Sequence, residues 1–169
     1  MVHSFPKEQS QDKPIVVIIG GGFAGLAVTK ELDGLNAEVV LLDRQNHHLF
    51  QPLLYQVATA SLSPANISAP IRSILPRNSK CQVVRSDVLG IDKQNKRVIV
   101  PEGSAPYDYL IIATGVRHHY FGNEQWEPFA PGLKTLSDAT EIRRRMLLSF
   151  ESAEHEADPE ARKAALTFV

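Results

Sequence analysis

The chain has 169 residues, of which 43% are hydrophobic and 22% charged, an ordinary composition for a globular domain with a buried core. Its formal net charge of −1 argues against nucleic acid as a partner and against electrostatic docking on an anionic lipid surface. No apolar run reaches the ~18 residues of a transmembrane helix, and the single cysteine excludes an internal disulfide and, by itself, a cysteine-based metal site.

Residues 1–13 are polar and contain no apolar stretch of the kind found in signal peptides, which predicts a disordered tail. Residues 14–169 are expected to form the folded part of the chain. The absence of a signal peptide and the single cysteine together favour a reducing cytoplasm.

The stretch from Lys13 to Asp43 predicts a strand, a glycine-rich turn, a helix and a second strand within about 30 residues. The apolar runs at 15–19 and 39–42 are typical of strands buried on both faces of a parallel sheet. Between them, the helix is expected to end near Gly34 and to bury one face. That face consists of Ala24, Ala27, Val28 and Leu32.

The turn satisfies the pattern G-x-G-x-x-G, and each glycine has a mechanical role in that pattern. Gly20 permits the tight turn, Gly22 lets the backbone approach a pyrophosphate, and Gly25 lets the helix pack closely on the strand. The helix N-terminus then presents N–H groups and the positive end of its dipole to the phosphates. Asp43, 18 residues after Gly25, lies where a carboxylate accepts hydrogen bonds from ribose hydroxyls. The unit predicts a dinucleotide site and leaves open whether the ligand is FAD or NAD.

The segment 44–60 is too apolar for a solvated loop and lacks a clean period, so we expect it to cover a core edge or a flat apolar ligand. Ser63 and Pro64 then predict the N-cap and first position of a helix. This helix is expected to reach about Leu75, with Pro70 as a candidate kink.

Two strands are predicted between residues 82 and 100, the first running to Ile91 and the second covering 97–100. Residues 101–104 predict a further turn. A buried strand at 107–112 follows and ends in the small residues Ala113, Thr114 and Gly115. This second small-residue turn suits another backbone approach to the same dinucleotide, at the carboxyl edge of the sheet.

Residues 116–134 are loop-like, and Ser137 is predicted to cap a helix with Glu141 and Arg145 as an i,i+4 pair. Residues 164–169 predict the start of a buried strand that is cut off at the terminus, so the chain is expected to be C-terminally truncated. The predicted helix buries an apolar stripe: Ala139, Ile142, Met146, Leu147, Phe150 and Ala153.

The remaining chemistry-bearing residues are interpreted as structural. The two histidine pairs, 47–48 and 118–119, lack an acidic or cysteine cluster, and adjacent histidines point in different directions in most backbones, so no metal site is expected. Cys81 is expected to be an unreactive thiol at a strand edge.

Four stretches together resemble the type II NADH dehydrogenases, single-subunit, non-proton-pumping flavoproteins with two dinucleotide-binding domains. They are IIGGGFAGL at 18–26, the terminal pair Asp43–Arg44, HHLFQPLLYQVATASLSP at 47–64, and YDYLIIATG at 107–115. The resemblance implies an α/β fold, a Rossmann-like FAD-binding domain with a parallel sheet and an inserted β-hairpin or meander. Residues 14–169 would be the first segment of that domain.

The resemblance also implies which residues contact FAD. Five parts of the family's FAD site are each matched in the chain. They are a pyrophosphate turn, an acid on the adenosine ribose, a segment beside the ribityl chain and isoalloxazine, a backbone contact to the adenine, and a second FAD turn. In that order they are Gly20, Gly22, Phe23, Ala24 and Gly25; Asp43, with Arg44 beside the adenine; Gln51, Pro52 and Gln56 within 51–56; Val88; and Ala113, Thr114 and Gly115.

In the resembled family the flavin takes hydride from NADH and passes two electrons to a membrane quinone, on the cytoplasmic face of the inner membrane. The resemblance therefore implies an oxidoreductase with FAD as cofactor, NADH and quinone as partners, and no catalytic or metal-binding side chain in this segment; a homodimer stays open. The family's second glycine motif, later G-D motif and C-terminal region do not occur in the sequence. The chain alone is expected to be unable to oxidise NADH and to bind FAD weakly if at all. The alternative is a nucleotide-binding or interaction fragment without redox turnover.

Overall fold

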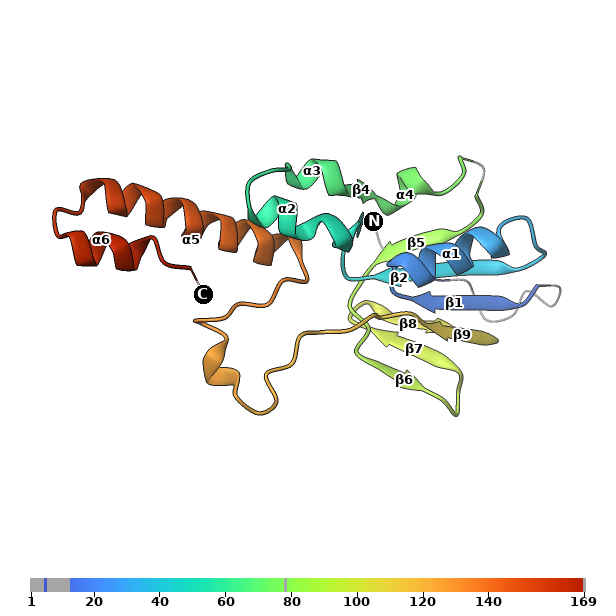
Figure 1. Cartoon of the computed structure of the whole chain (residues 1–169). Helices are drawn as coiled ribbons and strands as arrows, with labels where there is room; N and C mark the ends of the chain where they lie inside the picture. Colours follow the sequence, from blue (N-terminus) through green and yellow to red (C-terminus); the bar gives the residue numbers. More distant parts are fainter. Residues whose placement is uncertain (1–4, 6–12, 78, 169) are drawn as a thin grey trace. The chain divides into compact units, whose positions relative to one another are not determined.

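A computed structural model describes residues 5, 13–77 and 79–168, and they divide into two compact units (Figure 1). Unit 1 comprises Met1–His48 and Ala69–Val116, and unit 2 comprises Leu49–Ser68 and Arg117–Val169. The predicted tail falls largely on residues 1–4 and 6–12, which lie outside the described residues.

Unit 1 is built on a four-stranded parallel sheet in the order β5-β2-β1-β9. Helix α1 (Phe23–Leu32) connects the first two strands, as predicted. Every residue of β1 is buried, because both faces of the sheet are covered, which is the reason for its unbroken apolar run. The strands are β1 (Ile15–Ile19), β2 (Glu38–Asp43), β5 (Gln82–Arg85) and β9 (Tyr109–Ile112).

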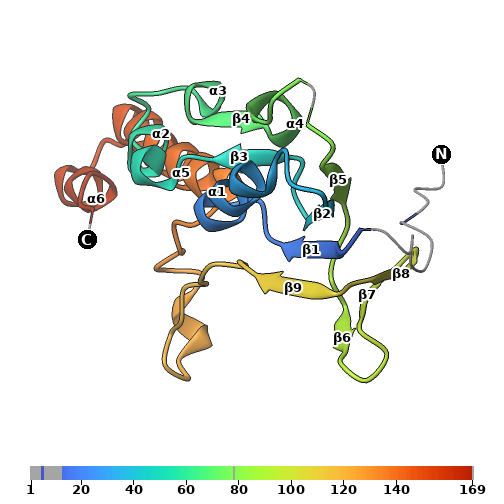
Figure 2. The same cartoon turned by 90° about the vertical axis from the view of Figure 1, so that its right-hand side faces the viewer.

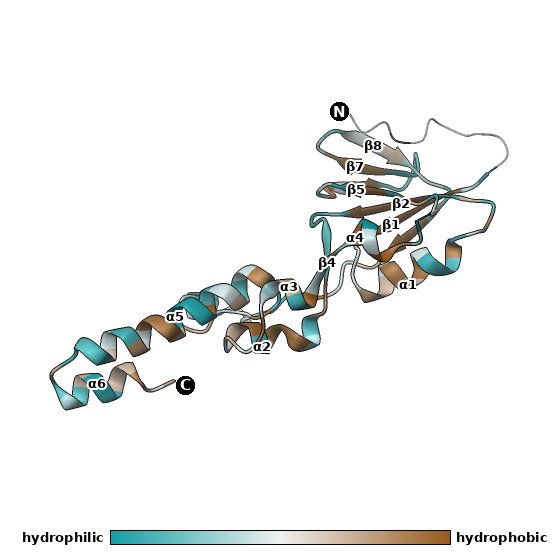
Figure 3. Cartoon of the chain, turned by 90° about the horizontal axis from the view of Figure 1, so that it is seen from above, coloured by the Kyte–Doolittle hydropathy of each residue, from teal (hydrophilic) through white to brown (hydrophobic). Residues whose placement is uncertain are grey.

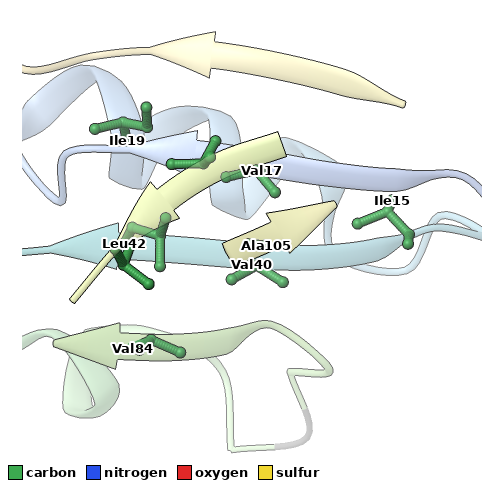
Figure 4. Packing of buried hydrophobic residues seen from close by; sticks show 9 residues of the cluster. Ile15, Val17, Ile19, Val40, Leu42, Val84 and Ala105 are labelled. Atoms are coloured by element: carbon green, nitrogen blue, oxygen red, sulfur yellow. The ribbon is translucent and has the colours of Figure 1, made fainter. Parts of the chain in front are cut away.

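One face of the sheet is covered by an antiparallel meander of β6 (Gly90–Asp92), β7 (Arg97–Val100) and β8 (Gly103–Pro106). Ala105 of the meander packs there with alternate side chains of β1 and β2 (Figure 4). The other face packs against Leu26 of α1 and Ile71 of α4 (Ile71–Ile74). The predicted Rossmann-like sheet with an inserted meander is confirmed.

Two details of unit 1 differ from the prediction. The predicted strand from residue 82 to Ile91 is two strands in different sheets, since Ser86 N–H donates to Asp43 O and Leu89 N–H donates to Ile99 O. The predicted turn at 101–104 also overlaps β8.

The buried face of α1 matches the prediction only in part, because Val28 and Leu32 pack against the core whereas Ala24 and Ala27 are exposed. Gly25, Leu26 and Thr29 are buried instead. Thr29 is hidden although it is polar, because its hydroxyl donates a 2.8 Å hydrogen bond to the Gly25 carbonyl.

The predicted helix from Pro64 to Leu75 is interrupted. Ser63 accepts from Ala65 N–H and caps α3 (Pro64–Ile67), which confirms the predicted start. Strand β4 (Ser68–Pro70) then separates α3 from α4, because the residue before a proline disfavours helical dihedrals. β4 pairs with β3 (His47–Leu49) in a two-stranded sheet.

Unit 2 packs α2 (Leu54–Ala58) against α5 (Leu136–His155), around a core that includes Leu54, Val57 and Ala139. The prediction that the segment 44–60 covers a core edge is confirmed for α2. Short 3₁₀ turns at Gln51–Leu53 (η1) and Glu124–Trp126 (η2) complete this unit.

Helix α5 starts earlier than predicted, because Thr135 and not Ser137 is its N-cap. Thr135 and Asp138 form a capping box, in which each side chain accepts from the other residue's backbone N–H. Glu141 pairs with Arg145 at 2.8 Å as predicted, and with Arg144 as well. Within the predicted stripe, Ala139 and Ala153 are buried while Leu147 and Phe150 are 44% and 49% exposed. The alternating colours along α5 in Figure 3 reflect this mixed surface.

The predicted strand at 164–169 is wrong. Asp158 caps a helix, α6 (Pro159–Ala165), with Pro159 at its first position, so Ala164 and Ala165 are helical. Leu166, Thr167 and Phe168 form no strand, and Val169 lies outside the described residues. Across the residues that the structure describes, no helix is long and apolar enough to cross a membrane.

Candidate nucleotide-binding site

The loops of unit 1 that follow the four parallel strands all lie at one edge of the sheet, since parallel strands end on the same side. β1 lies between β2 and β9, and β1 and β9 run side by side in the same direction (Figure 2). The next strand in the chain after β1 is β2, on one side of β1, whereas β9 lies on its other side. Parallel sheets bind ligands at such a switch point, outside the carboxyl ends of the strands. All the predicted site residues of unit 1 follow the strands at this edge.

The three motif glycines have different surroundings. Gly20 has a φ of +105°, and a Cβ there would collide with the Ala113 carbonyl oxygen of the neighbouring loop. A Cβ on Gly25 would collide with the Gly20 carbonyl oxygen. Gly22 has a φ of −75°, and a Cβ added there would meet no protein atom within 4 Å, so its lack of a side chain leaves open space.

The turn is held by both neighbouring strands. Gly20 N–H donates to Leu42 O of β2 at 2.8 Å, and Ala113 N–H donates to Ile19 O of β1 at 2.8 Å. The second small-residue turn continues through Thr114, which is exposed, to Gly115, whose φ is +69°. The glycine turn and the second turn are therefore brought together, as the sequence predicted.

Asp43 closes β2 with a half-buried carboxylate held by two backbone groups. Its Oδ2 accepts from Gly21 N–H at 2.5 Å and its Oδ1 accepts from Gln45 N–H at 2.6 Å. A carboxylate has lone pairs for further acceptance at both oxygens, so this arrangement orients Asp43 without exhausting it.

Gly21 is a site residue that the sequence pattern misses, since the motif treats its position as variable. It is buried, and a Cβ there would lie 2.6 Å from Ile71 Cδ1 and 3.2 Å from Asp43 Oδ2. Its contact to Asp43 depends on residues far along the chain. The only signal in the sequence is a third glycine between the two that the motif requires.

Helix α1 starts directly at the glycine turn. Its N-cap, Gly22, has no side chain with which to cap the helix, and the first turn contains no acidic residue. Phe23, 52% exposed, and Ala24 occupy the first two helical positions. A helix start of this kind suits an anion, because backbone N–H groups and the helix dipole both favour negative charge.

The other edge residues flank Asp43. Ser86 N–H donates to Asp43 O at 2.9 Å, and Arg85 Nε donates to the carbonyl oxygen of Arg44 at 3.3 Å. Val88 follows at a half-buried position and packs against the core between sheet and meander.

Gln51, Pro52 and Gln56 belong to unit 2 and are positioned by that unit. Gln51 Nε2 donates to Lys134 O at 3.2 Å, and Gln56 Nε2 donates to the Tyr55 hydroxyl at 3.0 Å. Gln51 and Pro52 are exposed in η1, and Gln56 is half-buried in α2.

The other chemistry-bearing side chains singled out by the sequence are the two histidine pairs and Cys81. The described part of the chain contains no group of three or more histidine, cysteine or acidic side chains that could hold a metal ion. Burial raises the pKa of the Cys81 thiol to about 11, opposed in part by a hydrogen bond with the Leu41 backbone. At neutral pH this thiol is protonated, as expected for an unreactive cysteine.

Comparison with known proteins shows the family to which the chain belongs. A family model described as pyridine nucleotide-disulphide oxidoreductase matches residues 14–153. The chain is 43% identical over 168 residues to the type II NADH:quinone oxidoreductase Ndh of Mycobacterium tuberculosis. The aligned region covers 97% of this chain and 36% of that protein. It is 32% identical over 169 residues to the mitochondrial external alternative NADH-ubiquinone oxidoreductase of Yarrowia lipolytica, covering 93% and 29% respectively.

The solved structure of NDH2 from Plasmodium falciparum in complex with NADH superimposes with a TM-score of 0.77 at 25% identity, covering 84% of this chain and 30% of that one. The chain spans about a third of the length of the curated relatives it matches. The resemblance to type II NADH dehydrogenases is confirmed by these similarities. The chain belongs to the pyridine nucleotide-disulphide oxidoreductase family.

Proposed function

We propose that this chain is the FAD-binding portion of an NADH dehydrogenase-like flavoprotein, and that the carboxyl edge of unit 1 holds the adenosine diphosphate half of FAD. The observation that carries the proposal is the coupling of the glycine turn to Asp43 through Gly21 N–H at 2.5 Å. One bond fixes the pyrophosphate turn and the ribose acid relative to each other.

The residues present fit the cofactor. Gly22 leaves open space where the backbone would approach the pyrophosphate, and the start of α1 presents N–H groups to its charge. The Asp43 carboxylate retains acceptor capacity for ribose hydroxyls. Arg44 and Val88 are proposed to flank the adenine, and Ala113, Thr114 and Gly115 to make the second backbone contact.

Gln51, Pro52 and Gln56 are proposed to contact the ribityl chain and isoalloxazine, on the strength of the family resemblance. A bound flavin would supply two-electron chemistry, and this chain's own residues would bind and orient it. Oxidation of NADH and reduction of a quinone are proposed only for a chain of the relatives' length, because the relatives named for this activity are about three times as long. Association with a membrane face is proposed on the family resemblance alone.

The test is the visible absorption spectrum of the purified chain, followed by release and identification of any nucleotide and by titration with FAD and NAD. We expect weak but saturable binding of FAD, seen as flavin absorbance at ~450 nm that stays with the protein when free nucleotide is removed, and weaker binding of NAD. An Asp43→Asn variant is expected to bind FAD about tenfold more weakly, because it loses a charged acceptor.

Two results would decide against this proposal. A chain that binds NAD but not FAD would contradict the flavoprotein assignment. Bound FAD that NADH never reduces, even together with the remaining parts of a longer relative, would favour a nucleotide-binding or interaction fragment without redox turnover.

A further inference from the structure

Both backbone polar groups of Gly21 are held by side chains. Its N–H donates to Asp43 Oδ2, and its carbonyl oxygen lies 3.2 Å from His48 Nδ1. A carbonyl oxygen only accepts hydrogen bonds, so Nδ1 of His48 must carry the proton in this contact. Asp43 thus holds the N–H of Gly21, and His48 holds the carbonyl oxygen of the same residue.

The His48 ring makes a second contact at the start of the helix. Its centroid lies 4.9 Å from that of Phe23, with an interplanar angle of 89°, an edge-to-face arrangement that favours both rings. Phe23 is the first residue of α1 and directly follows Gly22. One half-buried side chain thus contacts both the glycine before Gly22 and the residue after it.

These two contacts lie at the residues directly before and directly after Gly22. Gly22 has no protein atom near the position of an added Cβ, and no side-chain cap restrains the N-terminus of α1. Fixing the Gly21 carbonyl and the Phe23 ring limits rotation of the intervening peptide units. The backbone N–H groups that would face a pyrophosphate are then oriented before ligand binds, which lowers the entropic cost of binding.

We propose that His48 is a positioning residue for the dinucleotide turn: its Nδ1–H holds the Gly21 carbonyl and its ring holds Phe23, so that the peptide units around Gly22 are preset for a pyrophosphate. This inference rests on the proposed function, because it assigns His48 to the same site. It commits the side chain to orientation and gives it no part in electron transfer.

The test compares three variants of the full 169-residue chain. His48→Phe keeps a ring beside Phe23 and removes the donor, whereas His48→Asn keeps an N–H donor near the position of Nδ1 and removes the ring. His47→Phe is the matched control, since His47 is an equally half-buried neighbour whose Nδ1 contacts Asn46 Oδ1 at 3.3 Å.

The readouts are the dissociation constant for FAD and the amide hydrogen-exchange rates of Gly22 and Phe23, with urea unfolding as the measure of global stability. We expect His48→Phe to weaken FAD binding about fivefold, the effect of one neutral hydrogen bond, and to speed exchange at these two amides. His48→Asn should recover most of the affinity, and His47→Phe should match the parent chain within about twofold.

Equal FAD affinity and equal local exchange in His48→Phe and His47→Phe would overturn the inference. So would a loss of affinity in His48→Phe that only follows a drop in global stability and is not recovered in His48→Asn. If the parent chain binds no FAD, the proposed function fails for this chain, and the exchange rates at Gly22 and Phe23 still decide whether His48 positions the turn.

Discussion

Two glycines of the turn after β1, Gly22 and Gly25, have different surroundings, and the sequence motif also assigns them different roles. A Cβ at Gly25 would collide with the Gly20 backbone, which cannot move without disturbing β1. A Cβ at Gly22 meets no protein atom within 4 Å, so packing against the protein does not exclude a side chain there, whereas the proposed approach of a pyrophosphate would. We therefore assign Gly25 a role in packing and propose a role in ligand binding for Gly22.

Substitution by alanine tests this distinction. Gly25→Ala is expected to lower the free energy of unfolding by about 2 kcal/mol or more through overpacking, and to lower FAD affinity with it. Gly22→Ala is expected to cost less than about 1 kcal/mol, the loss of a glycine N-cap, while weakening FAD binding at least about tenfold. The measurements are urea unfolding and FAD titration. Parallel losses in both quantities for both variants would contradict the separate roles.

At this scale the sequence predicted residue types better than contacts. Gly20, Gly25 and Asp43 follow from the motif, because their roles depend on the local turn and on fixed spacing. Gly21 and His48 do not, because their contacts join residues 22 and 27 positions apart, and nothing local marks them.

At the scale of elements, the start of α5 shows how a local prediction can be displaced by two residues. Ser137 has the residue type of a cap, but Thr135 and Asp138 have the spacing of a capping box and form it. Burial raises the pKa of the Asp138 carboxyl, and hydrogen bonds from the N–H groups of Lys134 and Thr135 more than offset this, so the net pKa is lowered.

Thr135→Ala is accordingly expected to destabilise the first turn of α5 by about 1 kcal/mol, whereas Ser137→Ala should change it by less than about 0.5 kcal/mol. Because the pKa of Asp138 is lowered on folding, its contribution is present above about pH 4 and is lost as the pH falls through the lowered value. Amide exchange in the first turn of α5, measured at pH values on both sides of this range, checks both points. A larger effect of Ser137→Ala than of Thr135→Ala would identify Ser137 as the cap instead.

Elements that depend on distant partners were the ones that sequence patterns missed. The apolar run 15–19 is recognisable because a strand buried on both faces needs no alternation. The break between β5 and β6 is not, because it is set by hydrogen bonds from Ser86 to Asp43 and from Leu89 to Ile99. The helical end of the chain was missed for a different, local reason: the capping pair Asp158–Pro159 starts a helix that includes Ala164 and Ala165.

In the molecule as a whole, unit 1 assembles its candidate site from four separate stretches of chain at one edge of one sheet. Each stretch follows a parallel strand, so the topology alone brings them together. The predicted flavin contacts Gln51, Pro52 and Gln56 come from unit 2. The sequence predicted the edge because the carboxyl ends of parallel strands meet on one side of the sheet.

Binding of the adenosine diphosphate half of FAD at this edge can be mapped from the amide chemical shifts of the ¹⁵N-labelled chain during titration with FAD. We expect saturable shifts concentrated at residues 20–25, 43–45 and 113–115, with none at the opposite edge of the sheet around Gly34 and Ala37. ADP should reproduce the same shifts. Shifts confined to other surfaces, or saturation by NAD and not by FAD, would contradict binding of FAD at this edge.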